Sequence, residues 1–143
     1  MIALDEKLSK RFPGARIETG VVIGDSCRID PGCEISEGTV LEQKVALCAN
    51  VHIQGDVHIG IGCVIRENAT LIGPLQIKEH SFIGPGSIIG AAKEDEINNH
   101  PTILGTQVRV GKAAVITAGI HIGDGARIRA RSKVIGDVPR NGL

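Results

Sequence analysis

Aliphatic residues recur at every sixth position through most of this chain, and the residues between them are mostly polar or small. A second, usually small residue stands four positions after each aliphatic one, so two positions of each repeat suit burial on one face of a strand. The remaining positions are rich in Gly, Asp, Asn and Pro, which favour turns. This pattern predicts an all-β parallel β-helix. Strands separated by so few residues must coil, so that equivalent strands of successive coils stack on one another. The aliphatic series is Ile17, Ile23, Ile29, Ile35, Leu41, Leu47, Ile53, Ile59, Ile65, Leu71, Ile77, Ile83 and Ile89, followed by Leu104, Val110, Ile116, Ile122, Ile128 and Val134.

The repeat loses phase once, because Ile89 and Leu104 stand 15 positions apart instead of 12 or 18. Residues 91–102 are therefore expected to leave the coil as an extruded loop. This segment contains three consecutive carboxylates, two asparagines and His100, and loops on a rigid scaffold often carry function. The alternative is a surface insertion that the scaffold tolerates.

The segment before the repeat is expected to form a cap. Leu4, Leu8 and Phe12 stand four apart and a Pro-Gly pair follows them, which predicts a short helix that ends in a breaker. Because a solenoid needs capped ends, we expect this helix to cover the open first coil. The expected organisation is an N-terminal cap over residues 1–16 and one β-helix domain over residues 17–143.

The composition narrows the classes of partner. The 143 residues suffice for one domain, and the formal net charge is 0, so neither nucleic acid nor a membrane surface is expected as a partner. The aromatic residues, Phe12 and Phe82, are too few to form a platform for stacked bases. No apolar run reaches the ~20 residues of a membrane helix, and the N-terminus lacks the apolar stretch of a signal peptide. A cytoplasmic protein is therefore expected.

The succession of an aliphatic residue, often Gly or Asp, and a small residue four positions on resembles the hexapeptide-repeat family over residues 17–138. The resemblance implies a left-handed, three-sided parallel β-helix in which three repeats form one coil. Residues 100–139 look like the acetyltransferases of that family that act on sugars, such as the galactoside and maltose O-acetyltransferases. This likeness is carried by His100-Pro101-Thr102-Ile103-Leu104-Gly105, Val108-Arg109-Val110-Gly111, Val115-Ile116-Thr117-Ala118-Gly119, Ile120-His121-Ile122-Gly123-Asp124-Gly125 and Asp137-Val138-Pro139.

The resemblance implies transfer of an acetyl group from acetyl-CoA to a hydroxyl or amine of a sugar or sugar nucleotide. In that group a histidine of the extruded loop acts as general base at a subunit interface, and imidazole suits this role because it gains and loses its proton near neutral pH. By position His100 is the candidate base, and Thr117, Ala118 and Gly119 match the coil that flanks the pantetheine arm. The loop residues expected to orient the base or bind the acceptor are Glu94, Asp95, Glu96 and Asn99. No metal is expected.

The resemblance also implies a homotrimer with parallel coil axes. Outward residues one coil apart would stack, and one such stack is Arg28, Ala46, Val64 and Phe82. Exposed apolar stripes often mark interfaces, so Ala46, Val64 and Phe82 are the expected subunit contact. The alternative is an ordinary scatter of apolar residues over the surface.

Three cysteines occupy the small inward position of the repeat, and the fourth occupies a turn position. Cys27, Cys33 and Cys63 occupy the small inward position and are predicted to be buried packing residues. Cys27 and Cys63 would stand two coils, or ~9.6 Å, apart, which is beyond disulfide reach. Cys48 occupies a turn position, where exposure is expected.

Several residues depart from the family's pattern. His100 is followed directly by Pro101, and Arg109 stands where an aromatic residue is usual. The small residues of the last coils are replaced around Arg129 and Arg131. These two arginines either contact the phosphates of CoA or block its groove.

The other histidines support weaker alternatives. His52, His58 and His121 take outward positions, where solvated or subunit-contact histidines are usual, and His80 takes a turn position. Each is a candidate base if His100 belongs to a surface loop without function. A γ-class carbonic anhydrase would share this fold, but its three zinc-binding histidines have a spacing that no pair here matches. A β-helix that serves as a scaffold or binds a sugar nucleotide without catalysis is the other open interpretation.

Overall fold

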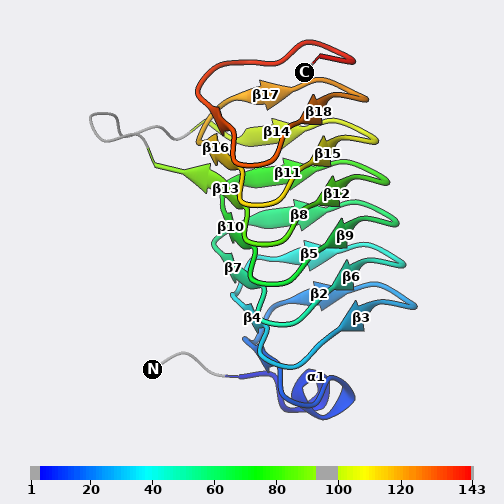
Figure 1. Ribbon diagram of the computed structural model, residues 1–143. Coiled ribbons are helices and arrows are strands. Elements are labelled where there is room, and N and C mark those ends of the chain that lie inside the picture. The colour runs from blue at the N-terminus through cyan, green and yellow to red at the C-terminus, as the bar shows by residue number, and fades with distance from the viewer. Residues whose placement is uncertain (1–3, 93–99, 143) are drawn as a thin grey trace.

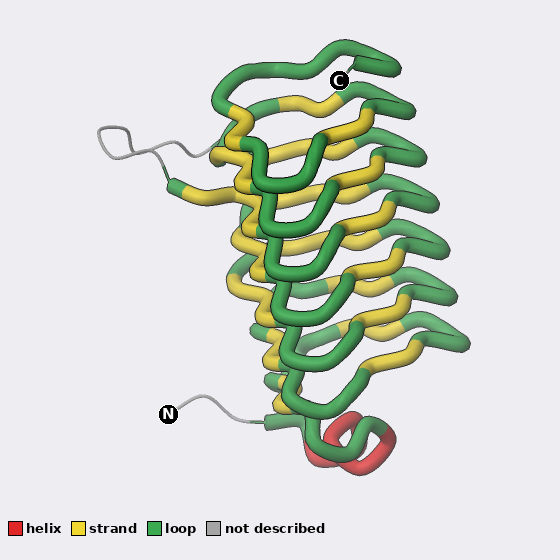
Figure 2. Tube along the Cα trace, in the orientation of Figure 1, coloured by secondary structure: helices red, strands yellow, loops and turns green. Residues whose placement is uncertain are grey.

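The protein is described by a computed structural model in which residues 4–92 and 100–142 are placed. The chain forms a three-sided prism that rises from the N-terminus to the C-terminus, with like strands stacked along each side (Figure 1). Strands of two to four residues alternate with short turns at the corners, which Figure 2 separates by colour. Such short strands persist because each strand inside a sheet pairs with the coils above and below it.

Three parallel sheets form the sides, and neighbours in each sheet are three strands apart in sequence. The first face comprises β1 (Arg16–Ile17), β4 (Glu34–Ile35), β7 (His52–Gln54), β10 (Thr70–Ile72), β13 (Ile88–Ala91), β16 (Val115–Thr117) and β19 (Lys133–Val134). The second face comprises β2 (Val22–Ile23), β5 (Val40–Leu41), β8 (Val57–Ile59), β11 (Leu75–Ile77), β14 (Thr102–Leu104) and β17 (His121–Ile122). The third face comprises β3 (Arg28–Ile29), β6 (Ala46–Leu47), β9 (Val64–Ile65), β12 (Phe82–Ile83), β15 (Arg109–Val110) and β18 (Arg127–Ile128).

Successive coils stack in register 18 residues apart, as Thr70 beside Ile88 illustrates. The coil is left-handed (Figure 1), opposite to ordinary crossover connections between parallel strands. The fold class predicted from the repeat and its family resemblance, an all-β left-handed parallel β-helix, is therefore confirmed.

The sixth-position aliphatic residues form the core. Along most of the helix they are buried, and they stack on one another through the coils. Ile23 and Val134, which belong to the end coils, are only partly buried, because no further coil covers them. The fully buried members with the largest side chains are Ile17, Ile35, Leu41, Leu47, Ile53, Ile59, Ile65, Leu71, Ile77, Ile83, Ile89 and Leu104.

The cysteines are free thiols, and the prediction for one of them is wrong. Cys33 and Cys63 are buried in the inward position, and Cys27 there is partly buried. Cys48 is also buried, with 8% of its surface exposed, although it lies in a turn. Burial, and a hydrogen bond with Glu67 one coil above, raise the pKa of the Cys48 thiol.

A short helix, α1 (Glu6–Arg11), lies at the open end of the first coil (Figure 1). The carboxylate of Asp5 caps it by accepting a hydrogen bond from the Leu8 N–H at 3.0 Å. Phe12 ends the helix and is 8% exposed, packed against the core of the β-helix. Leu4, which the spacing placed on the same helix, lies before it and pairs with Glu18 instead.

The interruption of the repeat lies between β13 and β14. Ile88 pairs with Val115, which is 27 positions later instead of 18, so this coil contains nine additional residues. Residues 93–99 lie outside the described part of the chain. No helix within residues 4–92 and 100–142 has the length and apolar character needed to span a bilayer.

Candidate functional site

The two ends of the interruption are tied to the coil above them. The Ala118 N–H donates to the carbonyl of Ala91 at 2.8 Å, at the end of β13. The Gly119 N–H donates to Oγ1 of Thr102 at 2.9 Å, at the start of β14. The loop stem, defined as Ala91 and Thr102 with Thr117, Ala118 and Gly119, is therefore one connected unit at the corner between the first and second faces.

Local sequence accounts for this stem. Thr102 and Thr117 are buried, and the Thr117 hydroxyl donates to the carbonyl of Val134 at 3.0 Å, which joins the stem to the last coil. The register between β13 and β16 shifts between Ile89 and Ala91. Gly90 allows that shift, since its φ of +89° suits glycine and a Cβ there would collide with the carbonyl oxygen of Ile72.

The structure brings some of the predicted site residues together. His100 is exposed and stands two positions before Thr102, so the candidate base enters at the same corner as Thr117, Ala118 and Gly119. The predicted acceptor-binding residues Glu94, Asp95, Glu96 and Asn99 lie outside the described residues.

Arg129 and Arg131 lie elsewhere in the protomer. They follow β18, at the corner between the third and first faces, and both are exposed. The N–H of Arg131 donates to the carbonyl of Lys112 at 2.8 Å, in the turn of the coil below. Within one protomer these arginines are therefore separated from the loop stem by a whole side of the prism.

The backbone donors of the stem are already used. The N–H groups of Ala118 and Gly119 bond to Ala91 and Thr102, and the hydroxyl of Thr117 donates to Val134. These three residues can offer a surface to a cofactor arm, but the thioester oxygen would need other donors. Their clearest role in the protomer is to anchor the interruption.

A cavity of about 520 Å³ lies on the second face, over β14 and β17 and the turns that follow them. It brings cationic, anionic and imidazole groups together with an aliphatic floor. Its lining residues are Lys78, Ile103, Gly105, His121, Ile122, Gly123, Asp124, Asp137, Val138, Pro139 and Arg140.

His121 is the residue of this cavity that sequence reasoning placed among ordinary outward histidines. Its own N–H donates to Oδ1 of Asp137 at 2.8 Å, which orders the backbone at the start of β17. His121 pairs in register with Ile103, the first outward position after the loop. The 18-residue spacing between Ile103 and His121 is the feature of the sequence that could have identified His121.

The remaining outward histidines have carboxylate neighbours on the coil below. Nδ1 of His52 lies 3.3 Å from Glu34, and Nε2 of His58 lies 2.8 Å from Glu42. Both pairs are substantially exposed, which is the arrangement of ordinary surface charges. Within residues 4–92 and 100–142 no group of three or more His, Cys, Asp or Glu side chains is placed to hold a metal ion.

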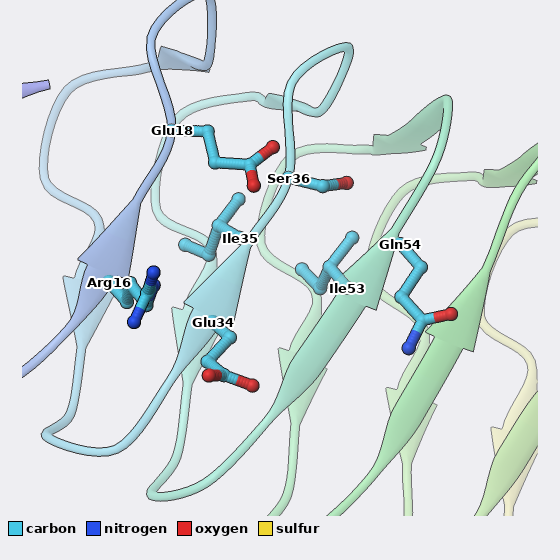
Figure 3. A pocket seen from close by; sticks show the side chains of 7 residues that line it. All are labelled: Arg16, Glu18, Glu34, Ile35, Ser36, Ile53 and Gln54. Carbon is cyan, nitrogen blue, oxygen red and sulfur yellow. The ribbon is translucent and has the colours of Figure 1, made fainter. Parts of the chain in front are cut away.

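A second hollow, of about 300 Å³, lies on the first coils (Figure 3). Glu18, Ser36 and Gln54 succeed one another there along one corner. Glu18 accepts a hydrogen bond from the Glu37 N–H, and Ser36 accepts one from the Gly55 N–H, both at 2.8 Å. Its polar side chains thus stabilise turns, and it lies at the opposite end of the prism from the loop stem.

The left-handed coil and its loop stem define the class of protein, and comparison with known proteins agrees. The family model described as the hexapeptide repeat of succinyl-transferase matches residues 20–54 and 101–130. These two segments therefore share the hexapeptide repeat of that family model.

The relatives include the bifunctional protein GlmU of Acidithiobacillus ferrooxidans, 34% identical over 91% of this chain. GlmU of Francisella philomiragia is 28% identical over the same share. The chain spans only 26% and 27% of these two proteins, about a quarter of their length.

Among solved structures, the GDP-perosamine N-acetyltransferase of Caulobacter crescentus, a histidine-to-alanine mutant in complex with CoA and GDP-perosamine, has a similar fold. The TM-score is 0.55 with 20% sequence identity, over 94% of this chain and 57% of that one. At this identity the likeness concerns the fold.

Proposed function

We propose that this chain is a CoA-dependent acyltransferase that acetylates an amine or hydroxyl of a sugar or sugar nucleotide. The observation that carries the proposal is the loop stem, which ties the interruption of the repeat to Thr117–Gly119. The cavity that His121 lines is on the second face, which starts at this stem. A related fold that binds CoA and a nucleotide-linked amino sugar supports this choice of substrates.

The reaction requires a base and an oxyanion site. A histidine takes the proton of the acceptor N–H or O–H while the acceptor nitrogen or oxygen attacks the thioester carbonyl. The carbonyl oxygen becomes an oxyanion, and the C–S bond then breaks to release the CoA thiolate, which takes up the proton. Because the N–H groups of Ala118 and Gly119 are engaged, other donors must stabilise the oxyanion.

His100 is the proposed base, because it enters from the interruption at the loop stem. Asn99 or a carboxylate of Glu94, Asp95 or Glu96 would orient it or bind the acceptor. His121 is the second candidate, since it faces the adjacent cavity together with the positive charge of Lys78. In a homotrimer a neighbouring subunit would complete the site, and Arg129 and Arg131 would reach CoA phosphates only across such an interface.

The first experiment is titration with acetyl-CoA while thermal unfolding is followed. A ligand at ~100 times its dissociation constant should stabilise the fold by ~2.7 kcal/mol. Release of CoA thiol is then measured with amino-sugar nucleotides as acceptors. We expect His100→Ala to abolish transfer while binding and assembly persist, and His52→Ala, which removes an exposed histidine of the first face, to have no effect.

The results assign the base. If His100→Ala stays active and His121→Ala does not, the base is His121. The engaged donors of Ala118 and Gly119 favour the alternative of a non-catalytic scaffold. An unchanged melting curve with acetyl-CoA, in a protein confirmed to be a trimer, would establish that alternative.

A further inference from the structure

Arg109 and Arg127 form a basic pair on the third face without a carboxylate to neutralise it. The two residues are direct partners in register on β15 and β18, and both are exposed. Adjacent strands stand ~4.8 Å apart, so the like charges repel one another. Among the residues that the structure places, neither guanidinium forms an ion pair.

Two other arginines have carboxylate partners. Arg28, at the same outward position of the third face on β3, lies 2.9 Å from Asp30. Arg66 lies 2.9 Å from Glu67 in the adjacent turn. The pair on β15 and β18 differs from these two arginines because its members are direct register partners and neither forms an ion pair among the placed residues.

A cavity of about 450 Å³ opens over this pair. Its lining combines two guanidiniums, an imidazole and two side-chain amides, and none of its lining residues is acidic. The residues are His80, Phe82, Gln107, Arg109, Gly125, Arg127 and Asn141.

Neighbouring residues hold the polar groups in place. The guanidinium of Arg109 lies 5.3 Å from the centroid of the Phe82 ring, in cation–π contact. The imidazole of His80 lies over Gly62, and the amide of Asn141 lies over Gly125. Glycine at these two corner positions leaves room for the side chains stacked above them.

We propose that this cavity binds a phosphate or diphosphate group. Guanidinium forks match the geometry of phosphate oxygens, and two forks on adjacent strands can share one anion that relieves their repulsion. The amides of Gln107 and Asn141 add neutral donors. The third face lies opposite the corner that holds the loop stem, so within one protomer this site is separate from the proposed acyl-transfer site. It continues the stack of Ala46, Val64 and Phe82, so in the expected trimer it lies at the edge of the subunit contact.

The test uses inorganic pyrophosphate as the probe, in calorimetric titrations at fixed ionic strength, because salt screens exposed charges. We expect Arg127→Gln to weaken binding about ten- to a hundredfold, since a hydrogen bond to a charged group is lost. Arg127→Lys, which keeps the charge without the fork, should be intermediate. Arg28→Gln is the matched control at the equivalent position of β3 and should bind as the wild type does.

Competition identifies the source of the phosphate group. Displacement of pyrophosphate by uridine diphosphate would indicate a nucleotide ligand, displacement by CoA would indicate the cofactor, and displacement by orthophosphate alone would indicate the free ion. Absence of pyrophosphate binding by the wild type, or equal weakening by Arg28→Gln and Arg127→Gln, would refute the site. Pyrophosphate binding without any acyl transfer would refute the proposed function and leave this site standing.

Discussion

Buried cysteine and serine side chains at the small inward position donate a hydrogen bond to a backbone carbonyl of the coil above. Sγ of Cys63 donates to the carbonyl of Lys78 at 3.0 Å, and Oγ of Ser81 donates to that of Gly105 at 2.8 Å. Oγ of Ser81 also accepts from the Val108 N–H at 3.1 Å, so this buried hydroxyl is fully used. The repeat therefore accepts these thiols and hydroxyls in its core with their hydrogen bonds formed, whereas the buried hydroxyl of Thr39 has no partner among the placed residues.

Burial of Cys63 predicts a specific loss of stability at alkaline pH. Burial raises the pKa of its thiol from 9.0 to about 11. Between these values the folded state retains a proton that the unfolded state has released, so stability is fully present below pH 9 and falls as the pH rises to 11. A rise in the pKa of this size corresponds to about 2–3 kcal/mol of stability.

The measurement is urea unfolding of the wild type and Cys63→Ala at pH 8 and at alkaline pH. Alanine occupies the equivalent inward position at Ala69, so the repeat should accept it. We expect the variant to be less stable at pH 8 and to lose less stability on alkalinisation. Parallel pH profiles for the two proteins would contradict the assignment, because lysines titrate equally in both.

The burial of a side chain could be predicted where it follows from the six-residue period. It could not be predicted where it depends on which residues of the next coil cover it. Ile17 and Cys33 follow from the repeat alone, because their positions point inward in any coil of this kind. Cys48 is buried although it follows a strand into a turn, where Glu67 of the next coil interacts with its thiol. A pattern read along the chain does not show what the next coil places over a turn.

At the scale of elements, the loop stem depends on one hydroxyl. Oγ1 of Thr102, at the start of β14, accepts the hydrogen bond of the Gly119 N–H, and Thr102 is 1% exposed. Thr39 offers a comparison, since it is equally buried but its hydroxyl has no hydrogen-bond partner among the placed residues. Comparing the same substitution at the two sites therefore separates the effect of the hydrogen bond on stability from the effect of side-chain size.

We expect Thr102→Val to lower the free energy of unfolding by about 1–3 kcal/mol, because it leaves the Gly119 N–H without an acceptor. Thr39→Val should leave stability unchanged or raise it slightly, because no bond is lost. Chemical denaturation of both variants provides the comparison, and hydrogen exchange of Gly119 should accelerate only in Thr102→Val. Equal destabilisation by the two substitutions would show that the bond contributes nothing.

The sequence located the interruption but not its attachment. The phase loss between Ile89 and Leu104 is visible in the aliphatic series. The bonds from Ala118 and Gly119 depend on the pairing of β13 with β16 across the insertion and on the bulge at Gly90. Those features belong to the register of neighbouring coils, which the length of an insertion leaves open.

Across the whole molecule, the side of the prism decides which residues can cooperate. Motif order along the chain placed Thr117 and Arg129 in one cofactor site, whereas the structure puts them at different corners. The 12-residue spacing between them, within a coil of 18 residues, could have shown that they lie at different corners. Residues 12 positions apart occupy different corners, so their cooperation in one site requires a second subunit.

The subunit contact itself is a prediction for the whole molecule. Ala46, Val64 and Phe82 are stacked in register on the third face, as the period required, and each is partly exposed. We expect Val64→Glu to dissociate the trimer, because a carboxylate buried in an apolar contact loses its hydration without a partner. Val22→Glu is the matched control, since Val22 has an outward position on the second face and is 58% exposed.

Sedimentation velocity should give the mass of a trimer for the wild type and Val22→Glu and that of a monomer for Val64→Glu, with the β-sheet signal of all three preserved. Because the proposed acyl-transfer site is completed by a neighbouring subunit, Val64→Glu should also lose transfer, although Val64 lies on the third face and the loop stem at the opposite corner. A folded Val64→Glu trimer would place the contact on another face. A monomer that retains full transfer would instead show that one subunit holds the entire site, and Arg129 and Arg131 would then have no part in it.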